Sequence, residues 1–207
     1  MTDESQTAFP VMPTLDHLRS VVLLRMVYVF LNALPERMRD DRRFRWTYVH
    51  AFRMCDKAIR EYQAARQAFG EAETITISSD DSSVARKGQL VMEATDHLDT
   101  CVDATHRALA AAQILRVNGI GTDMPAPDTS AVRRLNAIRD AMQHAEERLI
   151  ADNLRPGRLA FGPDDPYGIS AREHDFTIGA ETPVTYEEIA ALLEGCYRFA
   201  DVGGTMG

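Results

Sequence analysis

The sequence predicts a mainly α protein, an up-and-down bundle of four long helices and a C-terminal helix, to which a small β-hairpin is attached. Three observations support this fold class. Apolar residues recur every three or four positions along four long stretches, which is the helical period. Proline and glycine gather between these stretches. Finally, 45% of the 207 residues are hydrophobic, which is enough for one sizeable core.

The N-terminal part contains an arm and a first helix. We expect residues 1–13 to form a flexible arm that ends in proline. The first helix is predicted over about residues 15–34, where Thr14 or Asp16 can cap it and Pro35 ends it. Because the middle of this helix is apolar on nearly every side, we expect it at the centre of the bundle.

A second helix is predicted over about residues 41–69, where the apolar side chains step by three and four. Gly70 is expected to end it, since glycine is common just after a helix. Residues 70–83 then predict a polar loop with a short β-like run at Thr74–Ile77. A loop of this length in a compact domain is functional or mobile.

The third and fourth helices are predicted over about residues 84–118 and 130–153. The third carries one continuous apolar stripe along its whole length. A proline- and glycine-containing segment separates the two, and Thr129 or Ser130 is expected to cap the fourth helix.

The C-terminal part has a different character. Two strand candidates, residues 158–161 and 175–178, stand on either side of a loop rich in proline and glycine. They predict a hairpin extension over residues 156–182. Thr185 then caps a last helix, and Glu188 completes a capping box with it.

The whole chain is thus expected to form a single helical-bundle domain over residues 14–200. The glycine-rich residues 201–207 are predicted to be a disordered tail.

Composition limits the function classes. The net charge of −8 and the pI of about 5.2 argue against non-specific coating of nucleic acid, so any nucleic-acid site must be a local patch. Lys57 and Lys87 are the only lysines among 23 basic residues, which is typical of a high-GC bacterium. Any phosphate contact is therefore expected to be made by arginine.

The three cysteines are far apart and lack zinc-site spacing, which favours a reducing cytoplasm over a disulfide framework. The longest apolar run, residues 21–31, is broken by Arg25 and is too short to span a bilayer. We therefore expect a cytoplasmic protein without a membrane partner.

The stretch LNAIRDAMQHAEERL on the fourth helix carries the main candidate site. With Met142 at the middle of the apolar stripe, Arg139 falls about 60° away, at its rim. Asp140 and His144 fall at about 160° and about 200°, on the far side. They are four residues apart, so Asp140 could orient the imidazole while Arg139 grips a phosphate.

These residues resemble the Arg-x4–6-His motif of the HEPN superfamily, in which Asn, Asp or His commonly follows the arginine. Arg43 and Arg45 stand at similar distances before His50, but neither is followed by such a residue. The resemblance implies a homodimer that places two motifs face to face. It also implies a metal-independent endoribonuclease without a cofactor, often a toxin or phage-defence effector with an antitoxin partner.

In that case Arg139 would bind the phosphate, Asp140 would be the orienting polar residue beside the imidazole, and His144 would serve as acid and base. The ribose 2′-OH would attack the adjacent phosphate and leave a 2′,3′-cyclic end. A second interpretation is a solvated helix face on a non-catalytic helical interaction or dimerisation protein.

Residues 36–60 form the one basic region, with aromatic residues interleaved. Such a pattern could bind RNA through stacking and phosphate contacts, and it could equally be an aromatic core stripe with a solvated arginine face. The candidates for RNA contact are Arg42, Arg43, Arg45, Trp46 and Arg148.

The third helix is dense in metal-ligand types. Asp103 and His106 have the spacing of helical carboxylate–histidine sites, but a second such pair is not found in the sequence. We therefore expect no metal site, and an acidic surface strip along Asp96, Asp99 and Asp103.

Overall fold

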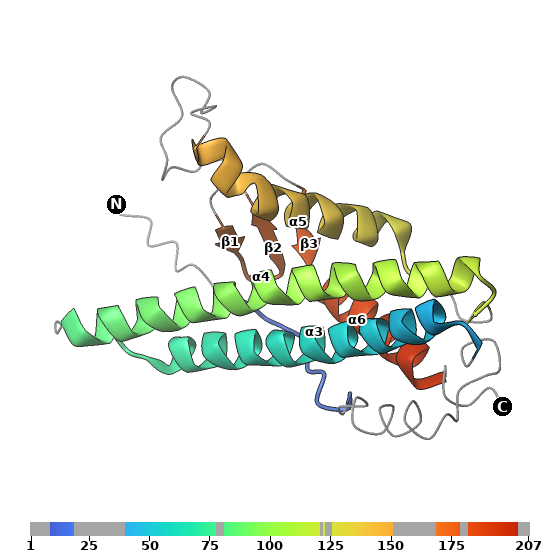
Figure 1. The fold of residues 1–207 in the computed structure, drawn as a ribbon. Coiled ribbons are helices and arrows are strands. Elements are labelled where there is room, and N and C mark those ends of the chain that lie inside the picture. Colours follow the sequence, from blue (N-terminus) through green and yellow to red (C-terminus); the bar gives the residue numbers. More distant parts are fainter. Residues whose placement is uncertain are drawn as a thin grey trace.

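The computed structural model describes residues 9–18, 40–77, 81–120, 122, 126–150, 169–178 and 182–202. These residues form a mainly helical fold with a small three-stranded antiparallel sheet, which confirms the predicted fold class (Figure 1). The helices are α3 (Arg42–Thr74), α4 (Asp81–Val117), α5 (Thr129–Ile150) and α6 (Tyr186–Val202). The strands are β1 (Ile169–Ala171), β2 (Asp175–Ile178) and β3 (Val184–Thr185).

The helices α3 and α4 form a long antiparallel pair that organises the fold (Figure 1). The helix α5 lies along one side of α4, with the sheet beside it, and α6 packs against α3 and α4. Among the residues that the structure describes, no helix combines the length and apolarity needed to cross a membrane.

The helix α3 confirms the second predicted helix but is longer. Asp41 caps its start, since its carboxylate accepts a hydrogen bond from the backbone N–H of Arg43 at 2.8 Å. The prediction that Gly70 ends the helix is wrong, as is the β-like run, because Thr74 is still helical and residues 75–77 form no strand. Ala72 is fully buried, so tertiary packing holds one more turn of helix than the glycine suggested.

The helices α4 and α5 lie where the third and fourth helices were predicted. Gly119 follows α4 with a φ of 80°, and Ile120 N–H donates to the carbonyl oxygen of Leu115 at 3.0 Å. This is the usual glycine ending of a helix. The cap of α5 is Asp128, one residue earlier than predicted, because its carboxylate accepts the backbone N–H of Ser130 at 2.8 Å.

The sheet confirms one predicted strand and supplies two that the sequence did not suggest. Residues 175–178 form β2, while the predicted strand at 158–161 lies outside the described residues. The observed partners of β2 are β1, with Ser170 opposite Thr177, and the two-residue β3. Both are too short to show an alternating pattern in the sequence.

The capping box of α6 is confirmed. The hydroxyl of Thr185 accepts from the N–H of Glu188 at 3.1 Å, and the carboxylate of Glu188 accepts from the N–H of Thr185 at 3.0 Å. Glu188 also pairs with Arg134 on α5, so the start of α6 is tied to its neighbour. The helix continues to Val202, two residues into the segment that was expected to be a tail.

Residues 9–18 already pack on the bundle, although the domain was expected to begin at residue 14. Met12 and Leu15 are buried, and the N–H of Val11 donates to the carbonyl oxygen of Glu173 at 2.7 Å. Leu15 and Leu18 close a turn at the predicted start of the first helix. The remainder of that helix, together with its expected central position, lies outside the described residues.

The main core joins the inner faces of α3, α4, α5 and α6 with β2 and residues 12–18. Its largest fully buried side chains include Tyr62, Leu98, Ile138 and Tyr186. A second cluster, around Phe52 and Leu115, lies where the start of α3 meets the end of α4 and the end of α6. All three cysteines are buried and unbridged.

Candidate functional site

The helix α5 presents Arg139 and Asp140 as the helical wheel predicted. Leu135 and Ile138 are fully buried against the core. The side chain of Arg139 follows at the rim and is 21% exposed, whereas that of Asp140 is 60% exposed. The apolar period of the helix therefore decides that the guanidinium leaves the core edge toward α4.

Arg139 is held by two carboxylates. Its Nη1 donates to Asp140 Oδ1 at 3.1 Å, and its Nε lies 3.7 Å from Asp103 Oδ1 on α4. Asp103 also pairs with Arg107 at 2.8 Å. The Nε of Arg139 and the Oδ1 of Asp103 are both buried, and neither makes a hydrogen bond within the described part of the chain. The hydrogen bond to Asp140 thus engages one of the five N–H donors of the Arg139 guanidinium.

The side chains of His144 and Arg148 lie outside the described residues, although both residues belong to α5. The expected Asp140–His144 hydrogen bond therefore stays a prediction. Asp140 stands one helical turn before His144, and its carboxylate bonds to Arg139.

Arg139 also lines an open groove of about 700 Å³ with residues of α3 and α4. We call this the α3–α4 groove. Its polar and aromatic lining consists of Trp46, Thr47, His50 and Arg53 from α3, His106 and Arg107 from α4, and Arg139 from α5. Its apolar lining includes Val49, Ala110, Ala111 and Ile114.

A second hollow of about 310 Å³ adjoins the α3–α4 groove, since Arg107 and Arg139 line both. It carries Lys57 on one side and the acidic Asp99 and Asp103 on the other. Burial, together with the nearby carboxylates of Asp103 and Asp96, raises the pKa of Asp99. Asp99 and Asp103 of the predicted acidic strip thus line the same hollow as the guanidinium groups of Arg107 and Arg139.

Among the predicted RNA contacts whose side chains the structure describes, only Trp46 lines the groove, and this residue is 56% exposed. Arg42, Arg43 and Arg45 are not part of the groove lining. Arg43 bonds to the capping carboxylate of Asp41 at 3.0 Å. These arginines belong to the first turn of α3, before the point where α4 and α5 form the walls.

Sequence reasoning did not single out Arg53, His106 and Arg107 as groove residues. A signal was present on α3, where Trp46, His50 and Arg53 follow the i, i+4, i+7 spacing of one helix face.

His106 is oriented by α5. Its Nδ1 lies 2.7 Å from the side-chain oxygen of Asn136. An amide oxygen only accepts hydrogen bonds, so Nδ1 carries the proton and Nε2 is left as the other ring nitrogen. Asp103 and His106, the carboxylate–histidine pair considered for a metal, therefore have other partners. Asp103 forms ion pairs with Arg107 and Arg139, and His106 is hydrogen-bonded to the amide of Asn136. Within the described ranges, no three His, Cys, Asp or Glu side chains come together as a metal site.

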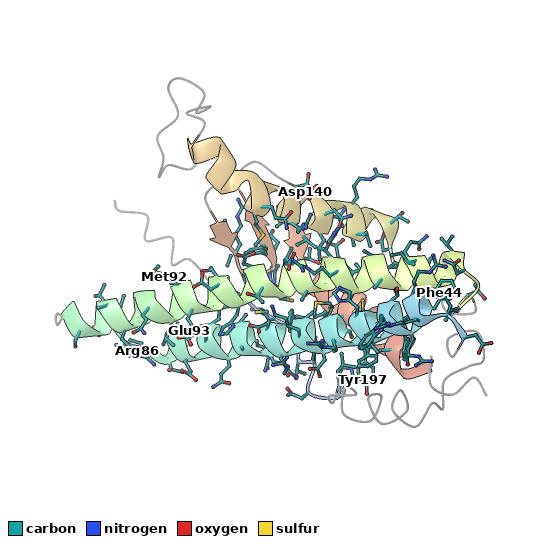
Figure 2. All side chains as sticks on the ribbon, in the orientation of Figure 1. Phe44, Arg86, Met92, Glu93, Asp140 and Tyr197 are labelled. Atoms are coloured by element: carbon teal, nitrogen blue, oxygen red, sulfur yellow. The ribbon has the colours of Figure 1, made fainter. Side chains whose placement is uncertain are left out.

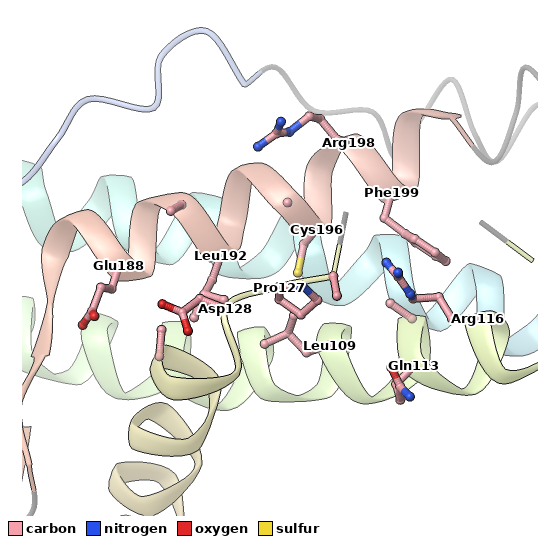
Figure 3. Close-up of a pocket in the computed structure, with 15 residues that line it drawn as sticks. Leu109, Gln113, Arg116, Pro127, Asp128, Glu188, Leu192, Cys196, Arg198 and Phe199 are labelled. Atoms are coloured by element: carbon pink, nitrogen blue, oxygen red, sulfur yellow. The ribbon is translucent and has the colours of Figure 1, made fainter. Parts of the chain in front are cut away.

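A second, apolar pocket of about 270 Å³ lies between α4, the start of α5 and α6 (Figure 3). Leu109, Leu192 and Phe199 form its walls. Its one thiol, Cys196, is not poised to react, because burial raises its pKa to about 12. This pocket lacks the histidines that the α3–α4 groove carries, so the groove is the better candidate for chemistry.

Comparisons of the chain with models of protein families, with curated proteins and with solved structures found no match. The functional assignment therefore depends on the residues of the groove and on their chemistry.

Proposed function

We propose that this protein is a metal-independent endoribonuclease of the HEPN type, which binds RNA along the α3–α4 groove. Arg139 binds the scissile phosphate, Asp140 orients the imidazole of His144, and His144 acts as the acid and base that transfers the proton. The 2′-OH attacks the adjacent phosphate and leaves a 2′,3′-cyclic end. A second copy of the chain contributes its own motif, and the biological role is that of a toxin or phage-defence effector.

One observation carries the proposal. The motif arginine and the aromatic, basic face of α3 are more than eighty residues apart in the sequence, yet Arg139, Trp46 and Arg53 line the same groove. An exposed indole is a stacking surface for an unpaired base, and guanidinium groups pair with phosphates. On a chain with a net charge of −8, this is the kind of local patch that binding to RNA requires.

The ion pairs of Arg139 fit a phosphate-binding role. The guanidinium has five N–H donors, and the bond to Asp140 engages one of them. Asp103 is shared between Arg139 and Arg107, so a phosphate can take up donors from both guanidinium groups while Asp103 keeps them in place.

The test is RNA cleavage by the purified protein in the presence of EDTA. We expect wild type to cut single-stranded RNA and to leave 2′,3′-cyclic phosphate ends, and we expect Arg139→Ala and His144→Ala to lose this activity. The matched controls are Arg86→Ala, at the end of the α3–α4 pair far from Phe44 (Figure 2), and His174→Ala in the exposed turn before β2. Both should cleave like wild type.

The same variants can be compared in cells. Expression of wild type should arrest growth, and His144→Ala should relieve the arrest. Cleavage that persists in purified His144→Ala, or that requires a divalent metal, would refute the assignment.

A non-catalytic interaction protein is the second candidate. It is favoured by Ile114, which is 52% exposed beside Trp46 in the groove and offers an apolar contact to another chain. In that case Ile114→Glu should shift the mass measured by light scattering from dimer to monomer, while wild type leaves RNA intact.

A further inference from the structure

We propose that His106 and His50 are a second acid–base pair of the groove, so that one chain holds the groups for RNA cleavage next to Arg139. This inference rests on the proposed function and adds two proton-transfer residues to His144, the one that the arginine–histidine motif names. It also defines the substrate as a single strand, whose 2′-OH and phosphate can enter the groove between α3 and α4.

The position of His106 is set from two helices. It lies on α4, is half-buried, and its Nδ1 is 2.7 Å from the Asn136 oxygen on α5. Asn136 precedes Arg139 by three residues, so the two project from neighbouring positions of one helix face. The imidazole and the guanidinium therefore meet the groove from adjacent points, and the ring is held by a bond that spans α4 and α5.

The bond to Asn136 also sets which ring nitrogen of His106 carries a proton. A neutral imidazole with its proton on Nδ1 has a lone pair on Nε2, which is the form of a general base.

His50 stands on the α3 side of the groove. It is exposed, and it lies one turn after Trp46 and one turn before Arg53. A base stacked on the indole of Trp46 would place its own phosphodiester along this row. An imidazolium at His50 would then face the bond to the leaving group, on the side opposite to His106.

The proposed step balances as follows. The Nε2 of His106 takes the proton of the 2′-OH, and the 2′-oxygen forms a bond to phosphorus. The bond between phosphorus and the 5′-oxygen breaks, and the imidazolium of His50 gives its proton to that oxygen. Arg139 and Arg107 face the charge that develops on the phosphoryl oxygens. The products are a 2′,3′-cyclic phosphate and a 5′-hydroxyl, and no metal or other reactant is consumed.

The test measures cleavage of a single-stranded RNA by His106→Ala, His50→Ala and His144→Ala in EDTA, with circular dichroism as a check of folding. A proton-transfer group contributes about 10²- to 10⁴-fold, so each of the first two variants should lose about that much. Added imidazole should restore part of the rate of His106→Ala. His17→Ala, an exposed histidine that pairs with Glu194, is the matched control.

The role of Asn136 as a positioning residue is tested separately, by comparing the cleavage rates of two Asn136 variants. Asn136→Asp keeps an oxygen for Nδ1 and should retain cleavage, whereas Asn136→Leu should lose it although the variant folds. A merely structural role for this side chain would not separate the two variants in rate while leaving their stability alike.

The outcomes distinguish the two proposals. If wild type does not cleave RNA, the proposed function fails and this inference falls with it. If wild type cleaves, His144→Ala is dead, and His106→Ala and His50→Ala cleave at the wild-type rate, the inference is overturned and the proposed function stands. If His106→Ala and His50→Ala lose cleavage and imidazole rescues the former, the inference is supported.

Discussion

The number of arginines in the α3–α4 groove makes a quantitative prediction about salt. Arg53, Arg107 and Arg139 line it, so a bound single strand should have about three phosphates neutralised. Each such contact contributes about −0.7 to the slope of log affinity against log salt, which gives a slope of about −2. Raising NaCl from about 50 to about 200 mM should therefore weaken binding about 20-fold.

A single substitution should change this slope by a defined amount. Arg53→Ala removes the arginine on the α3 side of the groove. Arg107 and Arg139, which both form ion pairs with Asp103, are left in place. The slope should fall to about −1.4, and the same rise in salt should then weaken binding only about sevenfold. Arg86→Ala, on the first turns of α4, should keep the wild-type slope.

The assay is the fluorescence anisotropy of a labelled single-stranded RNA whose ribose 2′-oxygens are methylated, so that it binds but cannot be cleaved by 2′-OH attack. Titrations at four or more salt concentrations give the slope directly. A wild-type slope near zero would refute the groove as a phosphate-binding surface. Equal slopes for wild type and Arg53→Ala would show that Arg53 contacts no phosphate, contrary to the proposed course of the RNA along α3.

Two further predictions concern stability. Thr185→Ala removes the acceptor of the Glu188 N–H at the start of α6 and should lower the free energy of unfolding by about 1 kcal/mol in urea titrations; an unchanged value would mean that the cap is dispensable. Burial raises the pKa of Cys101 and Cys196 to about 12, from 9.0 in the unfolded chain. Their contribution to stability is therefore complete below pH 9 and declines toward pH 12, because thiolates form first in the unfolded state. The urea midpoint should fall over this range, and less steeply in Cys196→Ala; equal pH profiles would contradict the assignment of the decline to this thiol.

Helix positions were predictable because their signals are local. The apolar period of residues 135–149 is enough to predict Arg139 at the rim of the buried stripe and Asp140 on the outer face, and both side chains lie there. The capping box of Thr185 and Glu188 was equally readable, since both partners are three residues apart.

Predictions failed where packing outweighs a local preference. Gly70 does not end α3, because the next turn buries Ala72 against the core. The strand β1 has only three residues and is held by its pairing with β2, which no sequence period reveals. In both cases distant residues supply the free energy that selects the conformation.

The sequence by itself determined the mainly helical class, the buried faces of α3, α4 and α5, and the positions of Arg139 at the rim and Asp140 on the outer face of α5. Side-chain direction repeats with the helical turn, so these positions follow from local sequence. Only the tertiary structure decided which residues surround Arg139. The packing of α3, α4 and α5 brings it beside Asp103 and Arg107 and into one groove with Trp46 and His106. These neighbours come from two other helices, α3 and α4, and their distances from Arg139 depend on how the three helices pack.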